Sequence, residues 1–71
     1  MASDRIELYT EFQYAANGSY YMIDLFTADG ESRSFTEKTL QKHVEAMEED
    51  GIACPVAKDA LAFLRFEIAS L

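Results

Sequence analysis

At 71 residues, the chain is close to the lower size limit at which one hydrophobic core holds a domain without disulfides or bound metal. A composition of 49% hydrophobic residues is too apolar for intrinsic disorder, so residues 1–71 are expected to fold as a single domain. The 13 acidic and 6 basic residues give a net charge of −7, which argues against direct binding of nucleic acid, because phosphate-binding surfaces are usually basic.

The single cysteine and the short apolar runs indicate a cellular compartment. Cys54 cannot form a disulfide within the chain, which fits a reducing environment. The first ten residues contain no apolar signal-peptide core, and the longest apolar run, Ala60–Leu64, is too short to cross a bilayer. We therefore expect a cytoplasmic protein that makes no membrane contact.

From Arg5 the sequence alternates between two sets of side chains, which is typical of a strand with one buried face. The side expected to face the core consists of Ile6, Leu8, Thr10 and Phe12. The opposite side, expected to face solvent, consists of Glu7, Tyr9, Glu11 and Gln13.

The central strand is predicted at Tyr20–Thr27, a segment rich in aromatic and β-branched residues between two turn signals. Asn17-Gly18 before it predicts a tight hairpin with the first strand, because both residues tolerate positive φ. With Asn17 and Gly18 as the central turn residues, the expected cross-strand pairs are Phe12–Ile23, Thr10–Leu25 and Glu11–Asp24. A four-residue loop would shift the partners by two and leave the faces unchanged.

A second turn signal, Asp29-Gly30, leads into a short strand, Glu31–Phe35, which completes a three-stranded antiparallel meander. A helix is then expected to begin near Thr36. Its start has two interpretations: a capping box from Ser34 to Glu37, or a Thr36 cap with a hydrophobic staple between Phe35 and Leu40.

The first helix is expected to bury Leu40, Val44 and Met47 on one face, with His43 beside them. Gly51 would end the helix in a left-handed conformation, and Ile52 would pack back on Met47 as in a Schellman motif.

The last segment has two interpretations. Alternation around Leu64, Phe66 and Ile68 would suit a fourth strand, whereas Pro55 and the following alanines favour a second helix. We predict the helix, with one apolar face of Leu61, Leu64, Ile68 and Leu71. The chain is therefore expected to be an α+β domain, in which the helices pack on the sheet face of Ile6, Leu8, Phe12, Ile23 and Leu25.

Residue types that carry catalysis or bind metal are scarce. His43 and Cys54 are single, and no paired spacing supplies further metal ligands or a group to orient a nucleophile. Glu11 and Asp24 would lie on an exposed sheet face without a pocket to shift a pKa. We therefore expect a non-enzymatic protein without cofactor or metal, with His43 at the core boundary and Cys54 as a small buried thiol.

Two groups of carboxylates stand where local electrostatics is unfavourable. Glu11 would face Asp24 across the hairpin, with Glu7 nearby, on a face that also shows Tyr9, Tyr20, Met22 and Phe26. The structural explanation of these carboxylates would be that Arg33, expected opposite Phe26, partly neutralises Asp24, or that the second helix covers this face. Glu48, Glu49 and Asp50 oppose the dipole of the first helix, and Glu45 repels Glu49, although such a run also suits a solvated surface.

These carboxylates and their aromatic neighbours are the predicted partner-binding residues: Glu7, Tyr9, Glu11, Tyr20, Asp24, Glu45, Glu48, Glu49 and Asp50. In size, charge and lack of catalytic motifs, the chain resembles the small acidic inhibitors that phages carry against host defence, including anti-CRISPR proteins. This resemblance of profile implies binding to a basic protein, such as a nucleic-acid-binding complex, and nucleic-acid mimicry. The alternative is a structural or adaptor module that forms a homodimer through a sheet edge or an apolar face.

Overall fold

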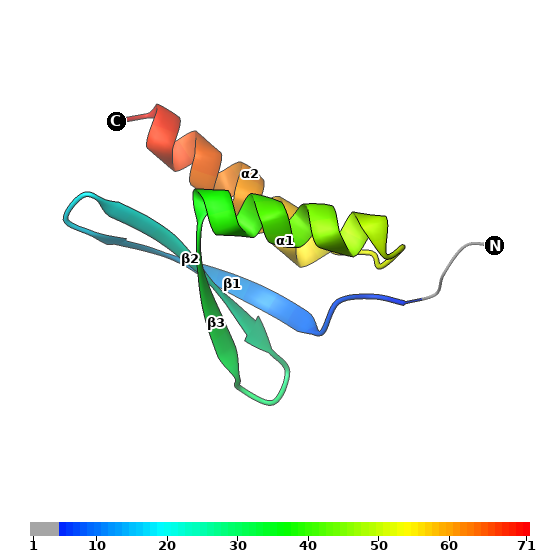
Figure 1. Ribbon diagram of the computed structural model, residues 1–71. Coiled ribbons are helices and arrows are strands. Elements are labelled where there is room, and N and C mark those ends of the chain that lie inside the picture. Colours follow the sequence, from blue (N-terminus) through cyan, green and yellow to red (C-terminus); the bar gives the residue numbers. More distant parts are fainter. Residues whose placement is uncertain (1–4) are drawn as a thin grey trace.

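The computed structural model describes residues 5–71, which form an α+β domain with the predicted order of elements. The elements are β1 (Tyr9–Asn17), β2 (Tyr20–Thr27), β3 (Ser32–Thr36), α1 (Glu37–Glu49) and α2 (Pro55–Ala69). The strands form one antiparallel sheet in the order β1-β2-β3, so β2 is central and β1 and β3 are the edges. Both helices cover the same face of the sheet, and no element among residues 5–71 covers the other face (Figure 1).

The core lies between the sheet and the two helices. Ile23 and Leu25 of the central strand are fully buried, as predicted, and Phe35 of β3 extends the same layer. The helices contribute the buried residues Leu40, Val44, Ala57, Ala60, Leu61 and Leu64. At about 1.5–3 kcal/mol for each large apolar side chain buried, these few residues supply most of the driving force for folding.

The first hairpin turns at Gly18-Ser19, one residue later than predicted. Asn17 pairs with Tyr20, and Gly18 has φ 67°, as a type II′ turn requires at its first central position. The partners are therefore shifted by two, and the observed pairs are Phe12–Leu25, Tyr14–Ile23, Gln13–Asp24 and Glu11–Phe26. The predicted Glu11–Asp24, Phe12–Ile23 and Thr10–Leu25 pairs are wrong, but the predicted faces of β2 and of Phe12 are correct because the shift is even.

An irregularity between Tyr9 and Glu11 reverses the alternation of the first segment. Tyr9 packs against the core and Glu7 is buried, whereas Ile6 and Leu8 are 62% and 79% exposed. The prediction that Ile6 and Leu8 belong to the core face is therefore wrong, and so is the prediction that Glu7 and Tyr9 face solvent beside Glu11.

The segment before β1 pairs with the chain that precedes α2 rather than with the sheet. Ile6 forms an isolated parallel bridge with Ala53. The Glu7 N–H donates to the Ala53 carbonyl at 2.8 Å, and the Ala53 N–H donates to the Arg5 carbonyl at 3.0 Å. This pairing fixes the chain entering β1 beside the N-terminus of α2.

The ends of α1 follow local sequence signals. Thr36 is the N-cap, and its capping box is completed by Thr39 instead of linking Ser34 to Glu37. At the other end Gly51 has φ 72°, and the Ile52 N–H donates to the Met47 carbonyl at 2.8 Å. The Gly51 N–H donates to Glu48, which completes the predicted Schellman motif.

The C-terminal segment is the helix α2, so the fourth-strand interpretation is wrong. Pro55 occupies the first turn, where its missing N–H leaves no bond unmade. Leu61 and Leu64 are buried as predicted, but Ile68 and Leu71 are exposed, because the end of α2 extends past the core.

Candidate binding surface

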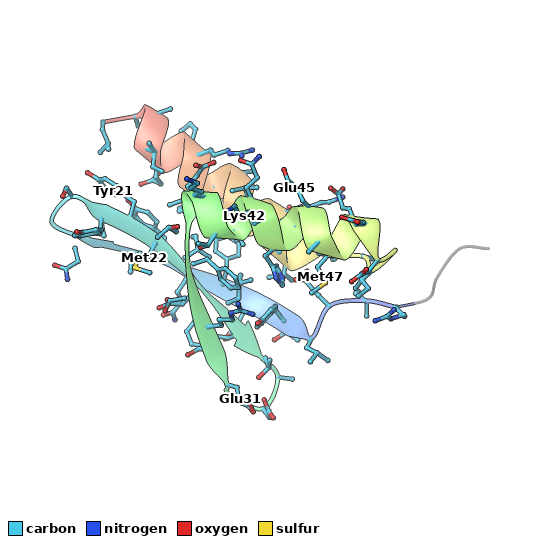
Figure 2. The ribbon with its side chains drawn as sticks, in the orientation of Figure 1. Tyr21, Met22, Glu31, Lys42, Glu45 and Met47 are labelled. Atoms are coloured by element: carbon cyan, nitrogen blue, oxygen red, sulfur yellow. The ribbon has the colours of Figure 1, made fainter. Side chains whose placement is uncertain are left out.

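The uncovered side of the sheet, called the outer face, is a surface on which no helix or strand among residues 5–71 packs. It consists of Glu11, Gln13, Ala15, Tyr20, Met22, Asp24, Phe26, Ser32 and Ser34, which alternate with the core-facing residues of their strands. Figure 2 shows Met22 pointing away from the helices and Tyr21 pointing towards them. Within these three strands, no lysine or arginine lies on the outer face.

Asp24 lies at the centre of the outer face, between Gln13 of β1 and Ser34 of β3. The Ser34 hydroxyl donates to Asp24 Oδ1 at 2.6 Å, which fixes the direction of the carboxylate. Glu11 is exposed one pair further along, beside Phe26. The sequence did not place Gln13 and Ser34 beside Asp24, because the register expected for the first hairpin differs by two residues from the observed one, and that expected for β2 and β3 differs by one.

Arg33 does not neutralise these carboxylates. It pairs with Leu25 on the core side of the sheet rather than with Phe26, and its guanidinium carbon lies 5.0 Å from the centre of the Phe35 ring. The two alternative explanations of this face, neutralisation of Asp24 by Arg33 and coverage by the second helix, are therefore both wrong. The acidic charge of the outer face is left uncompensated by the strands themselves.

The carboxylates of α1 lie on the opposite side of the molecule from the outer face. Glu45 points away from the sheet (Figure 2), and Glu49 and Asp50 are also exposed. Glu48 forms an ion pair with Lys58 Nζ at 2.8 Å, and Glu45 accepts a hydrogen bond from Gln41 at 3.0 Å. The predicted binding residues thus form two separate groups, and a flat partner surface cannot contact both at once.

Glu7 has a structural position rather than a place on either surface. Its Oε2 accepts hydrogen bonds from the N–H groups of Val56 and Ala57, at 2.7 and 3.2 Å. Cys54, the N-cap residue of α2, makes no side-chain cap of its own. Glu7 therefore caps α2 from a distant part of the chain, where a negative charge is favoured by the helix dipole.

Tyr9 and His43 belong to an aromatic cluster at the core boundary. The Tyr9 ring lies 6.5 Å from Phe35 and 5.9 Å from His43, and Phe35 lies 5.1 Å from His43. Tyr9 therefore packs on the helix side of the sheet, whereas Tyr20 remains exposed on the outer face. His43 lies at the core boundary, as the sequence predicted.

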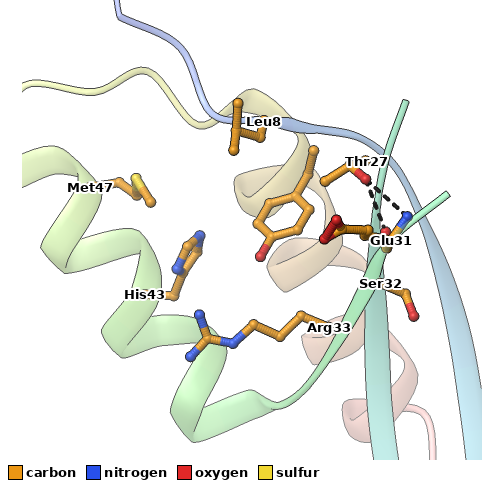
Figure 3. Close-up of a pocket in the computed structure, with 8 residues that line it drawn as sticks. Leu8, Thr27, Glu31, Ser32, Arg33, His43 and Met47 are labelled. Carbon is orange, nitrogen blue, oxygen red and sulfur yellow. Dashed lines mark hydrogen bonds between the residues drawn. The ribbon is translucent and has the colours of Figure 1, made fainter. Parts of the chain in front are cut away.

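A surface cavity of about 390 Å³ opens beside this cluster. Figure 3 shows Arg33 and His43 beside it, with Leu8 and Met47 on the apolar side. Tyr9 also lines the cavity. Desolvation and the nearby Arg33 charge lower the pKa of His43, which favours the neutral imidazole. His43 Nε2 is buried, and no group among residues 5–71 hydrogen-bonds to it, so nothing described here orients it for proton transfer.

Cys54 is buried, as predicted. Burial and the Glu7 carboxylate raise the pKa of its thiol, so the reactive thiolate is disfavoured. In residues 5–71, no three histidine, cysteine or acidic side chains are grouped closely enough to hold a metal ion. The described helices include none that is both long and apolar enough to span a bilayer.

Comparison of the chain with protein-family models, with curated proteins and with solved structures finds no match. The function must therefore be inferred from the chemistry of the surfaces described above.

Proposed function

We propose that this chain is a non-enzymatic binding protein that inhibits a basic, nucleic-acid-handling protein by occupying its basic site. The observation that carries this proposal is the uncovered outer face, which bears Glu11 and Asp24 and no basic side chain. Arrayed carboxylates present anionic oxygens to arginine and lysine as phosphates do, so such a face can compete with nucleic acid.

The apolar part of the outer face suits protein binding. Tyr20 is 70% exposed, and Met22 and Phe26 are half-buried beside the two carboxylates. Aromatic and methionine side chains are enriched where protein surfaces meet. Aromatic side chains bury much apolar area with few torsions to order, and methionine adapts its shape to the partner. Ser34 holds the Asp24 carboxylate in one direction before binding, which lowers the entropy lost on contact.

The two acidic groups have different roles in this proposal. Glu11, Tyr20 and Asp24 contact the partner, whereas Glu45, Glu49 and Asp50 lie on the far side and act through long-range attraction. A net charge of −7 speeds encounter with a basic partner, an effect that salt screens. In size and charge the chain resembles small phage inhibitors such as anti-CRISPR proteins, and the single buried thiol suits a cytoplasmic setting.

A capture experiment with matched charge variants tests the proposal. The immobilised chain is incubated with the heparin-retained fraction of a cell lysate, with and without duplex DNA as competitor. We expect a specific basic protein to be retained, to be displaced by DNA, and to lose its nucleic-acid-dependent activity on binding. Glu11→Gln with Asp24→Asn should weaken retention at least about tenfold, because two charge-assisted contacts are lost.

The control variant removes the same charge from the opposite side of the molecule, as Glu45→Gln with Glu49→Gln. It should slow association at low salt and leave dissociation unchanged. Equal losses from both double variants would mean that only net charge matters. Retention that neither variant reduces, or that DNA does not displace, would contradict the proposed function.

A further inference from the structure

We infer that the free edge of β1 accepts an extended, basic segment of the partner as a fourth strand of the sheet. This inference rests on the proposed function and specifies how the partner is held. Three observations lead to it: an unprotected edge, an exposed aromatic ring beside it, and the charge around both.

The edge of β1 presents backbone groups that lack partners among residues 5–71. In a hairpin closed by the Asn17–Tyr20 pair, the odd-numbered residues of β1 bond to β2, so Phe12, Tyr14 and Ala16 direct their N–H and C=O groups outwards. No hydrogen bond from another described element reaches these groups. An added strand would complete the ladder along this edge.

Edges of natural sheets are usually protected by proline, by lysine or by a covering element. β1 has nine residues and contains no proline, lysine or arginine. The irregularity near Tyr9 interrupts only its beginning, and the segment from Glu11 to Asn17 pairs without interruption. The exposed edge is therefore long enough to hold an extended segment.

Helix α2 places an exposed aromatic ring next to this edge. The Phe63 ring lies 5.8 Å from Phe12 and 5.6 Å from Tyr14, yet Phe63 remains 40% exposed. A strand added to β1 would lie beside this ring on the helix side of the sheet, and its apolar side chains would cover it.

The acidic side chains beside the β1 edge favour a basic strand as its occupant. Asp59 and Glu67 flank Phe63 at helical spacing, and Glu11 lies on the outer side of the same strand edge. Burial and the Glu67 carboxylate raise the pKa of the Tyr14 hydroxyl, in agreement with Glu67 facing β1. A second copy would bring the same carboxylates and another charge of −7 to this edge, whereas a basic strand complements them.

A strand with alternating character therefore fits best. Residues on its helix side would be apolar next to Phe63, with basic side chains able to reach Asp59 or Glu67 at the ends. Residues on its outer side would be lysine or arginine next to Glu11. Since the backbone supplies affinity and alternate side chains supply specificity, this mode of binding tolerates sequence variation in the partner.

The test uses defined peptides in fluorescence anisotropy with the full chain. The probe is a fluorescein-labelled nonapeptide of alternating lysine and valine, and the charge control alternates glutamate and valine. A third peptide carries the lysine sequence with N-methyl groups at alternate backbone nitrogens, which blocks ladder hydrogen bonds and keeps the charge. We expect saturable binding of the first, no binding of the second, and at least about tenfold weaker binding of the third.

Variants of the chain test the same edge from the other side. Ala16→Pro removes an outward N–H without breaking a bond to β2, and should weaken the lysine peptide at least about tenfold. Ala16→Val keeps the N–H and should bind as the parent does. Circular dichroism checks that both variants fold. Glu67→Gln should weaken binding about two- to fivefold at low salt.

Three outcomes would overturn the inference. The N-methylated peptide could bind as tightly as the unmodified one, or Ala16→Pro could bind like the parent, and either would mean that only charge attracts the peptide. In the third, sedimentation velocity would show self-association that Ala16→Pro abolishes, with no peptide binding, which would assign the edge to a second copy.

The capture experiment separates this inference from the proposed function. If capture of basic proteins depends on Glu11 and Asp24 but is not reduced by Ala16→Pro, the proposed function stands and the edge inference fails. If the edge binds the peptide while that capture fails, the proposed function fails alone.

Discussion

Glu7 offers the sharpest test of how the N-terminal segment is fixed in the fold. Its side chain is 7% exposed, and one carboxylate oxygen accepts from the N–H groups of both Val56 and Ala57 at the start of α2. Glu7→Ala removes this acceptor and leaves the N–H groups of Val56 (partly buried) and Ala57 (buried) without it. Loss of a helix cap costs about 0.5–2 kcal/mol, and a buried unsatisfied donor adds about 1–3 kcal/mol. We therefore expect Glu7→Ala to lower the free energy of unfolding by about 2–4 kcal/mol.

Such a loss would be large for this chain, because a domain of this size is stabilised by roughly 4–10 kcal/mol in total. Glu7→Gln is the matched control, because its amide oxygen can still accept both bonds. It loses the attraction of charge to the helix dipole, and its NH2 takes the buried position of Oε1, to which no group among residues 5–71 hydrogen-bonds. It should cost about 1–2 kcal/mol, less than Glu7→Ala. The assay is urea unfolding at pH 7 followed by circular dichroism at 222 nm. A Glu7→Ala variant within about 0.5 kcal/mol of the parent would refute the capping role.

Four further substitutions test the rest of the fold. Ile23→Ala, at the fully buried centre of β2, should cost about 2–5 kcal/mol in urea unfolding, and a cost below about 1 kcal/mol would contradict its place in the core. Glu49→Lys should stabilise the fold by about 0.5–1 kcal/mol, because it replaces a charge that opposes the α1 dipole by one that the dipole favours. Glu48→Lys should lower the melting temperature, because it replaces the ion pair with Lys58 by two neighbouring lysines. The opposite ranking of the two variants would refute the structural role of the Glu48–Lys58 ion pair. Because the pKa of His43 is lowered by folding, the unfolded chain binds its proton more tightly, and stability should fall as pH drops below about 6.5. In urea midpoints measured at several pH values, His43→Gln should flatten that fall, and an unchanged slope would point to other groups.

The elements that the sequence predicted correctly are those specified within a few neighbouring residues. Gly51 and Ile52 form the expected Schellman motif, because positive φ at Gly51 needs only a glycine at the right position. Thr36 caps α1 through Thr39, a partner of the same short reach as the predicted ones. The central strand was predictable because its aromatic and β-branched residues lie between two glycine turns.

The errors concern features that depend on distant contacts. The alternation that includes Ile6 and Leu8 continues without a break through Phe12, so nothing local announces the irregularity at Tyr9. Its cause is tertiary: pairing of the N-terminal segment with Ala53 and capping of α2 by Glu7 set the phase of the chain before β1. The hairpin register failed for another reason. Asn17-Gly18 and Gly18-Ser19 both suit a two-residue turn, and the two registers bury the same faces.

The corrected register changes the reason for assigning a partner to the outer face. Glu11 and Asp24 do not face each other in the observed register, and Asp24 accepts a hydrogen bond from Ser34. Repulsion between directly opposed carboxylates is therefore not an argument for a partner at this face. What favours a partner is instead that the uncovered face carries the large apolar side chains of Tyr20, Met22 and Phe26. Polar residues at these positions would serve stability equally well. β1 provides both Glu11 and the free edge. A strand added at that edge would extend the outer face by one row and place the basic side chains of the partner next to Glu11, so the proposed surface and the inferred edge form one continuous site.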